Sequence, residues 1–370
     1  MKQRAHAWVA LRALRLIDES KKEQARLLVE LLSYYLSDVW DGAWIPDTII
    51  SDMSYGHIFK MDSDDKFVEG ISSQPWRKAT YSDLKKETSG KRLCLEDYLK
   101  DSEELGKPYW VTEKSGKLPD RVIAINHSII DMLKLGDFPI AFYLKKKKSD
   151  AYKEEELSKQ KIKDLSLSPN FSARQIALTF FISSHYVCDA HMPLHCDLRD
   201  QFAQKVGEDK SERRLPKALH PGIEAAWEES FPDKEILTIH DYTRESIENV
   251  TSNMPKDSLI EIDKASSPYA LSKQIPSNVP NEWDEMTNIC RISYAASRKW
   301  MPQSLEQIQD LIGEDKCKPD APELQYNDIT KIVNEKDFKD VTNRIFHDAV
   351  ESVARIWYRA WDIFTGKPTS

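Results

Sequence analysis

The stretch HYVCDAHMPLHCD, residues 185–197, contains three histidines, two aspartates and two cysteines. The helical periodicity that leads into it places its first half on a helix. His185 and Asp189 are four residues apart, so their side chains project from the same face of that helix. Pro193 then interrupts the helix and lets His195 point elsewhere. Because burying such side chains without partners costs on the order of several kcal/mol, this pattern predicts a set of metal ligands.

The rest of the chain predicts more helices. Glycine accounts for only 11 of the 370 residues, and no segment shows a convincing strand alternation. We therefore predict an all-α fold, a multi-helix bundle that forms one domain over residues 1–370. Polar insertions are expected near residues 62–117, 145–168 and 231–280, the last of which either folds over the bundle or stays mobile. The predicted helices cover residues 4–18, 24–40, 121–134, 173–190, 220–229, 283–301 and 340–364.

Composition limits the class of protein. The formal net charge is −8 and the sequence pI is about 5.7, which argues against a dedicated nucleic-acid binder, although the lysine run at 145–148 could attract anions locally. The five cysteines are odd in number and irregularly spaced, so we expect a mostly reduced chain. The apolar segments are too short to span a bilayer, and the basic N-terminus lacks the continuous apolar core of a signal peptide. The chain as written is predicted to be cytoplasmic, or secreted if a leader was removed.

Three further places offer ligands. His220 and Glu224 are again four residues apart and therefore share a helix face. Two such pairs on two helices are typical of metal sites in the cores of bundles. His6 begins an apolar helical face in HAWVALRAL, where a charged imidazole would be poorly solvated. Asp47 and His57 flank a short loop rich in aromatic and turn residues.

The complete candidate set has five imidazoles and three carboxylates, a combination of nitrogen and oxygen ligands that suits zinc. The other histidines, at 127, 240 and 347, are expected at the surface or in hydrogen bonds. Cys188 and Cys196 lack a CxxC partner and are expected to be small buried residues. His191 is a supporting hydrogen-bond donor, a substitute ligand or a surface residue, and a role other than ligand is favoured. The candidate ligands are His6, Asp47, His57, His185, Asp189, His195, His220 and Glu224.

These residues resemble the superfamily of zinc-dependent phospholipase C and the single-strand-specific zinc nucleases. The central motif of that family is His, three residues, Asp, five residues and His, with Pro and an apolar residue before the last His. The downstream pair is similar as well, and its glutamate resembles the phospholipases more than the nucleases. The resemblance covers the bundle in outline but not the insertions. The residues that match the central motif are His185, Asp189, Pro193, Leu194 and His195.

The resemblance implies three zinc ions in a cleft of an all-helical domain. One zinc would be held by Asp47, His57, His185 and Asp189, and Asp189 would bridge to a second zinc that also takes His6. The third would be held by His195, His220 and Glu224.

The chain departs from the family pattern in several places. His191 and Met192 stand where the family usually has an amide pair, and Cys188 stands where it usually has glycine. The interval from Asp47 to His57 is shorter than is typical. The family also caps its second metal with the amine of a processed N-terminal tryptophan. That tryptophan is absent here, and the amine of Met1 is a candidate substitute.

The resemblance implies a zinc-dependent hydrolase of phosphate esters, with phospholipase C-like hydrolysis of a phosphodiester by metal-bound water. Asp47 is the carboxylate that we expect to orient or deprotonate that water. The substrate would be a phospholipid or a nucleotide, and the sequence indicates no specific protein partner. Two alternatives stay open: a single-strand nuclease or nucleotidase, and a non-catalytic, zinc-stabilised binding or scaffold protein.

Overall fold

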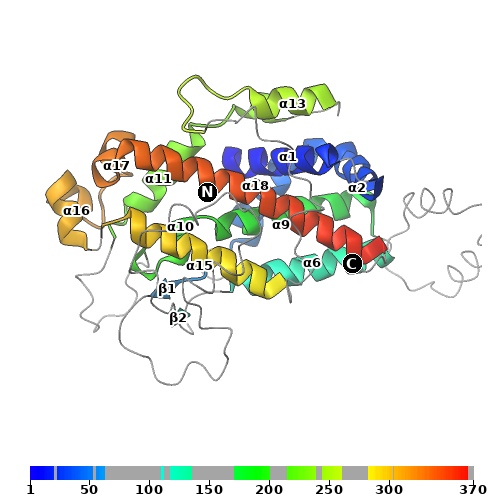
Figure 1. Cartoon of the computed structure of the whole chain (residues 1–370), viewed down its shortest axis with the longest axis horizontal. Coiled ribbons are helices and arrows are strands. Elements are labelled where there is room, and N and C mark those ends of the chain that lie inside the picture. Colours follow the sequence, from blue (N-terminus) through cyan, green and yellow to red (C-terminus); the bar gives the residue numbers. More distant parts are fainter. Residues whose placement is uncertain are drawn as a thin grey trace, which may run out of the picture.

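The structure is a computed structural model that describes residues 1–20, 23–52, 56–62, 110–111, 117–135, 171–200, 215–238, 244–260, 282–302 and 304–365. The described residues form the predicted all-α, multi-helix fold (Figure 1). The long helices are α1 (Gln3–Glu19), α2 (Glu23–Tyr34), α6 (Leu118–Leu135), α9 (Ala173–Ala190), α11 (Leu219–Glu228), α15 (Glu282–Trp300) and α18 (Glu335–Thr365). The short ones are α3 (Val39–Gly42), α10 (Pro193–Cys196), α12 (Lys234–Leu237), α13 (Arg244–Ser252), α16 (Leu305–Ile312) and α17 (Tyr326–Ile332). Single turns of other helix types are η1 (Leu36–Asp38), η2 (Pro46–Ile50), η5 (Leu198–Asp200) and η7 (Glu314–Cys317). A two-residue antiparallel pair, β1 (Met61–Asp62) with β2 (Trp110–Val111), is the strand structure among the described residues.

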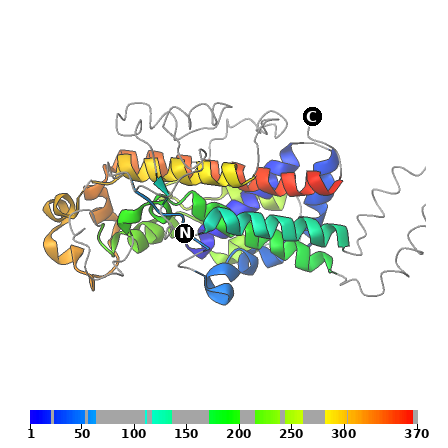
Figure 2. The same cartoon turned by 90° about the horizontal axis from the view of Figure 1, so that it is seen from below.

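Helix α9 is central to the bundle. It packs against α1, α6, α15 and α18, and α6 runs alongside it in Figure 2. Its N-terminus is fixed by a capping box in which Ser172 and Gln175 bond reciprocally. Phe180 and Phe181 are fully buried, and their ring centroids each lie 6.0 Å from that of Trp357 on α18. A helix buried on this scale holds its polar residues in a fixed position in the core.

The predicted helix over residues 24–40 is wrong as a single element. It ends at Tyr34, and the backbone then makes a tighter turn before α3, with the amide of Asp38 donating to the carbonyl of Tyr35. Helix α3 then packs closely on α9, because a Cβ added to Gly42 at the end of α3 would lie 2.8 Å from the Cβ of Phe181. The turn therefore brings α3, and the segment that follows it, against α9.

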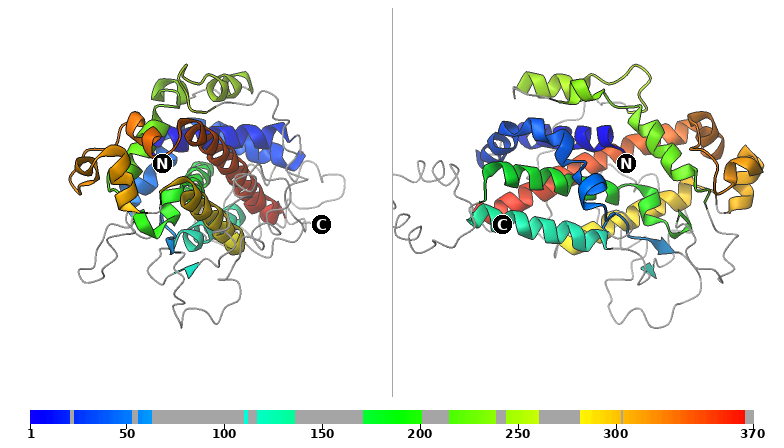
Figure 3. Two further views of the ribbon diagram at one scale, coloured as in Figure 1. Left: turned by 60° about the vertical axis from the view of Figure 1, so that its left-hand side comes forward. Right: turned by 180° about the vertical axis from the view of Figure 1, so that it is seen from behind.

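Part of the third predicted insertion covers the bundle. Helix α13 packs on the outer side of α1 (Figure 3). Arg15 on α1 donates to the hydroxyl groups of Thr251 and Ser252 at 3.1 and 3.0 Å. Nearly all of residues 62–117, all of 145–168 and the lysine run at 145–148 lie outside the described residues. In the described part of the chain, no helix combines the length and apolarity needed to cross a membrane.

Candidate metal centre

Helix α9 contributes the two side chains that open the candidate site. His185 and Asp189 are both fully buried, and His185 Nε2 lies 3.3 Å from Asp189 Oδ2. The other ring nitrogen, His185 Nδ1, lies 2.7 Å from the carbonyl oxygen of Ala43, just after α3. Because a carbonyl only accepts, Nδ1 carries the hydrogen and Nε2 is left to face the carboxylate.

Asp47 and His57 join this pair, as the resemblance implied. Asp47 lies on η2, where Pro46 starts the turn, and its Oδ1 is 3.3 Å from His185 Nε2 and 3.5 Å from His57 Nδ1. His57 Nδ1 is 2.7 Å from Asp189 Oδ2 and 3.1 Å from His185 Nε2. Two ligand atoms on one tetrahedral zinc lie about 3.4 Å apart, given bonds of about 2.1 Å. The separations in this group therefore fit one shared metal.

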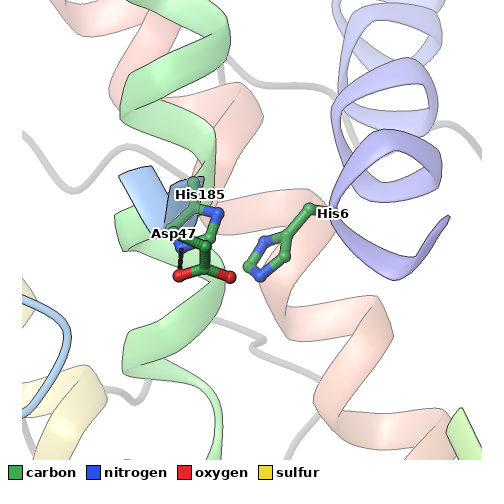
Figure 4. A group of neighbouring side chains, drawn as sticks. All are labelled: His6, Asp47 and His185. Carbon is green, nitrogen blue, oxygen red and sulfur yellow. Dashed lines mark ion pairs between the residues drawn. The ribbon is translucent and has the colours of Figure 1, made fainter. Parts of the chain in front are cut away.

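His6 reaches the same place from α1. Its ring stacks on that of His185, with centroids 3.8 Å apart and planes at 17°. Figure 4 shows His6, Asp47 and His185 pointing toward one another from α1, η2 and α9. The ligand atoms of these three residues lie within 4.8 Å of one another. His6 Nε2 is also 3.6 Å from Asp189 Oδ1, and these are the two residues that the resemblance assigns to a second metal.

The third predicted group also assembles. Glu224 Oε1 on α11 lies 3.2 Å from His220 Nε2 and 3.8 Å from His195 Nε2 on α10. These separations again fit a common metal. His195 Nδ1 is 3.5 Å from Asp189 Oδ1, so the third group adjoins the first two. The structure therefore brings all eight candidate side chains together.

Met1 lies inside the cluster. Its backbone amine is 2.5 Å from Glu224 Oε1 and 3.5 Å from Asp189 Oδ1, and its carbonyl oxygen is 3.1 Å from His6 Nε2. Glu228, one turn after Glu224, accepts the backbone N–H of Arg4 at 3.0 Å and so caps α1 in place of a local side chain. Helix α11 thus holds the start of the chain against the predicted ligands.

Two carboxylates and one lysine of the site were not predicted. Asp52 Oδ1 lies 3.0 Å from His57 Nε2, and Asp200 Oδ2 lies 2.9 Å from His220 Nδ1. Lys60 is buried and pairs with Asp200 at 2.9 Å. Carboxylates that hold the outer nitrogen of a metal-binding imidazole are a general feature of such sites. The nearest sequence signals were an aspartate five residues before His57 and a lysine inside the apolar segment IFKM.

The buried carboxylates favour the protonated, positively charged forms of the groups next to them. Burial lowers the pKa of His185, but the carboxylates of Asp189 and Asp47 outweigh it and raise the pKa to about 9. For the amine of Met1, burial is likewise outweighed by Glu224 and Asp189, and the pKa rises to about 11. The same excess of negative charge favours a divalent cation.

The donor set fits zinc. Burial lowers the pKa of His6 and of His195, which keeps both imidazoles neutral, the form that binds metals. His6 Nδ1 is buried without a hydrogen bond to any of the described residues, which is costly unless another partner binds. Cys188 is buried, and burial raises the pKa of its thiol, so it is a poor thiolate ligand.

The other histidines and cysteines have varied surroundings. His127 is exposed and His347 is half-buried, whereas His240 lies outside the described residues. Cys196 is buried, as predicted for both cysteines of the motif. His191 ends α9 and is only 4% exposed, so the alternative that it is a surface residue is wrong.

Comparisons with known proteins add no relative. No family model matches the chain, and no curated protein or solved structure matches it. The resemblance to the zinc-dependent phospholipase C superfamily therefore remains a prediction that rests on the residues quoted above.

Proposed function

We propose that the protein is a zinc-dependent hydrolase of phosphate esters that cleaves phosphodiesters in the manner of the zinc-dependent phospholipases C. The observation that carries the proposal is the convergence of all eight predicted ligands, which fall into three overlapping or adjoining groups with ligand atoms within 4.8 Å in each group. These ligands come from segments spread between residues 6 and 224. Core packing alone gives no reason for five imidazoles and three carboxylates to meet in one place.

Exposure within the cluster supports catalysis over a purely structural role. Most of the ligand side chains are buried, but Asp47 is 12% exposed and His220 and Glu224 are each 17% exposed. The group of His195, His220 and Glu224 has three protein ligands, and catalytic zinc sites commonly keep a fourth position for water or substrate. Solvent contact at this edge gives a phosphate ester a route to the metals.

We expect Asp47 to accept the proton of the attacking water. When bound, zinc supplies Lewis acidity, which lowers the pKa of water and neutralises charge on a phosphoryl group. Asp47 Oδ1 lies among the proposed ligands, 3.3 Å from His185 Nε2, while its side chain keeps contact with solvent. A carboxylate in this place can orient an attacking water and accept its proton.

Metal analysis and three substrates test this proposal. Protein purified from zinc-replete medium should contain about two to three zinc ions per chain, and less than one would contradict the proposal. Hydrolysis is then measured on a generic phosphodiester, a choline lipid and single-stranded DNA, each with and without added zinc. We expect zinc-dependent cleavage of the choline lipid. Preference for single-stranded DNA would assign the protein to the nuclease alternative, and full zinc content without any hydrolysis would support the scaffold alternative.

A further inference from the structure

A buried lysine lies directly behind the third ligand group. Lys60 is only 3% exposed, in an extended segment that also contains His57. Its ammonium donates to Asp200 Oδ2 at 2.9 Å and to the carbonyl oxygen of Leu194. A charge is strongly disfavoured in such a place unless it is paired and hydrogen-bonded. The pairing with Asp200 meets that condition.

Each hydrogen-bond partner of Lys60 is connected to one imidazole of the third group, either by a direct contact or as its neighbour in the chain. Asp200 Oδ2 also lies 2.9 Å from His220 Nδ1, which leaves Nε2 of that ring facing Glu224 at 3.2 Å. Leu194 directly precedes His195 on α10. The neighbouring residue of Lys60 adds a second bond to that helix, because the amide of Phe59 donates to the carbonyl oxygen of His195 at 3.1 Å. One short segment therefore supports both imidazoles from behind.

The same segment contributes to the other end of the cluster. His57, three residues before Lys60, lies 2.7 Å from Asp189 Oδ2 in the first group. Between them, the carbonyl oxygen of Ile58 accepts the amide of Leu118 at the start of α6, at 3.2 Å. Residues 57–60 are thus anchored on α6 and reach both ends of the cluster.

We propose that Lys60 and Asp200 are positioning residues for the third metal: the pair holds His220 and His195 in the orientation that binds zinc with Glu224. This inference rests on the zinc binding in the proposed function, and it adds two residues that touch neither metal nor substrate. The carboxylate acts on His220 directly, and the ammonium fixes both the carboxylate and the backbone that carries His195. Loss of such supporting contacts typically lowers metal affinity by about 10- to 100-fold.

A double variant separates positioning from folding. Lys60→Met with Asp200→Leu replaces the buried pair by apolar side chains, a change that for a buried ion pair is often neutral or stabilising. Zinc affinities are measured by titrating the metal-free protein, and the third binding step is recognised by its loss in Glu224→Ala. We expect the double variant to bind the third zinc about 10- to 100-fold more weakly and the others normally.

A more exposed pair of the same two residue types provides a control away from the cluster. Lys316 is paired with Asp328 on α17, and the same double substitution there should leave every zinc affinity unchanged. In zinc-loaded protein labelled with ¹⁵N-histidine, the proton on His220 Nδ1 should exchange more quickly with solvent in the Lys60→Met/Asp200→Leu variant than in the control. Neither readout depends on hydrolysis. An inactive wild-type protein would therefore contradict the proposed function without contradicting this inference. Wild-type affinity at the third step, or equal weakening of all steps, would overturn the inference.

Discussion

Two imidazoles of the first ligand group each have their outer nitrogen held by an oxygen. His185 is held by the carbonyl of Ala43 at 2.7 Å, and His57 by Asp52 at 3.0 Å. These oxygens accept a hydrogen bond, so each outer nitrogen carries the hydrogen and the inner nitrogen is oriented toward the other candidate ligands. Gly56 makes the second contact possible, because a Cβ at that position would lie 2.1 Å from Asp52 Oδ2.

Sequence spacing could predict the ligands but not their supports. The i, i+4 pairs can be recognised in the sequence, because residues four apart lie on the same face of a helix. These pairs are His185 with Asp189 and His220 with Glu224. Asp200 supports His220 across twenty residues of chain, and Lys60 supports Asp200 across 140. No local period relates such residues, so their roles follow from the way η5 and the segment at Lys60 pack beside α10 and α11.

Replacing Asp47 by asparagine tests its proton-handling role. The amide cannot accept a proton at neutral pH and is a weaker zinc ligand, so phosphodiesterase activity should fall by roughly 100-fold or more. The fold should persist, since the Asp47 side chain is 12% exposed. We would compare initial rates of zinc-loaded proteins, with circular dichroism to check helix content. Asp41→Asn, at an exposed carboxylate on α3, is the control and should retain wild-type activity.

Glu224→Ala tests the third metal position. Removing this carboxylate leaves His195 and His220 without the ligand that they share, so one zinc should be lost and activity should fall sharply. The change also leaves the amine of Met1 without its nearest partner, at 2.5 Å, and should destabilise the fold by about 1–3 kcal/mol. Elemental analysis and thermal denaturation measure the two effects. Glu229→Ala, at an exposed position after the same helix, should change neither. Retention of all zinc ions by Glu224→Ala would show that Glu224 is not a ligand.

Among the elements, the long amphipathic helices were predictable and the short ones were not. The patterns over residues 173–190 and 283–301 match α9 and α15 to within a residue at each end. Helices α16 and α17 have only eight and seven residues, too few for an apolar period to stand out. Such short helices depend on tertiary packing, which a local pattern does not contain.

Helix α11 is the element whose position matters most to the third group, because it carries both His220 and Glu224. Its Trp227 is buried and donates to the hydroxyl of Thr342 on α18 at 2.9 Å. On another side it approaches the backbone at Leu324, whose amide donates to the carbonyl oxygen of Ala218 at 3.1 Å. The helix is therefore fixed from two directions.

Gly222→Ala should displace α11. The added Cβ would lie 2.5 Å from the carbonyl oxygen and 2.9 Å from the amide nitrogen of Leu324, and backbone atoms cannot rotate away as a side chain can. We expect a loss of about 1–3 kcal/mol in the free energy of unfolding, together with weaker binding of the third zinc. Thermal denaturation of the metal-free protein and zinc titration measure these effects. Ala225→Ser, at a half-buried position on the same helix, should leave both nearly unchanged. Normal zinc affinity in Gly222→Ala would show that α11 tolerates the shift.

For the whole molecule, the cluster joins segments that lie far apart in the sequence. The ligands lie on α1, η2, the segment at His57, α9, α10 and α11, whereas α6, α15 and α18 provide core without any proposed ligand. Without a metal, the carboxylates of Asp47, Asp189 and Glu224 are offset by the amine of Met1 and by protonated histidine rather than by a divalent cation. Metal binding should therefore stabilise one side of the bundle more than the other.

Chelation should reveal this asymmetry. A zinc ion held at 1,000 times its dissociation constant stabilises the native state by about 4 kcal/mol, so removing two or three ions should lower the unfolding midpoint by roughly 5 °C or more. Hydrogen exchange followed by mass spectrometry should show faster exchange in α10, α11 and the start of α1. The middle of α18, whose Trp357 and Trp361 are fully buried, should stay protected because its contacts are apolar. Restored zinc should reverse both effects. The combined variant His185→Gln/His220→Gln, which lacks one ligand of the first zinc and one of the third, should respond less to chelator than the wild type. An equal increase of hydrogen exchange in α18 and α11 would mean that the metals stabilise the fold as one unit. An unfolding midpoint that chelation leaves unchanged would contradict metal binding.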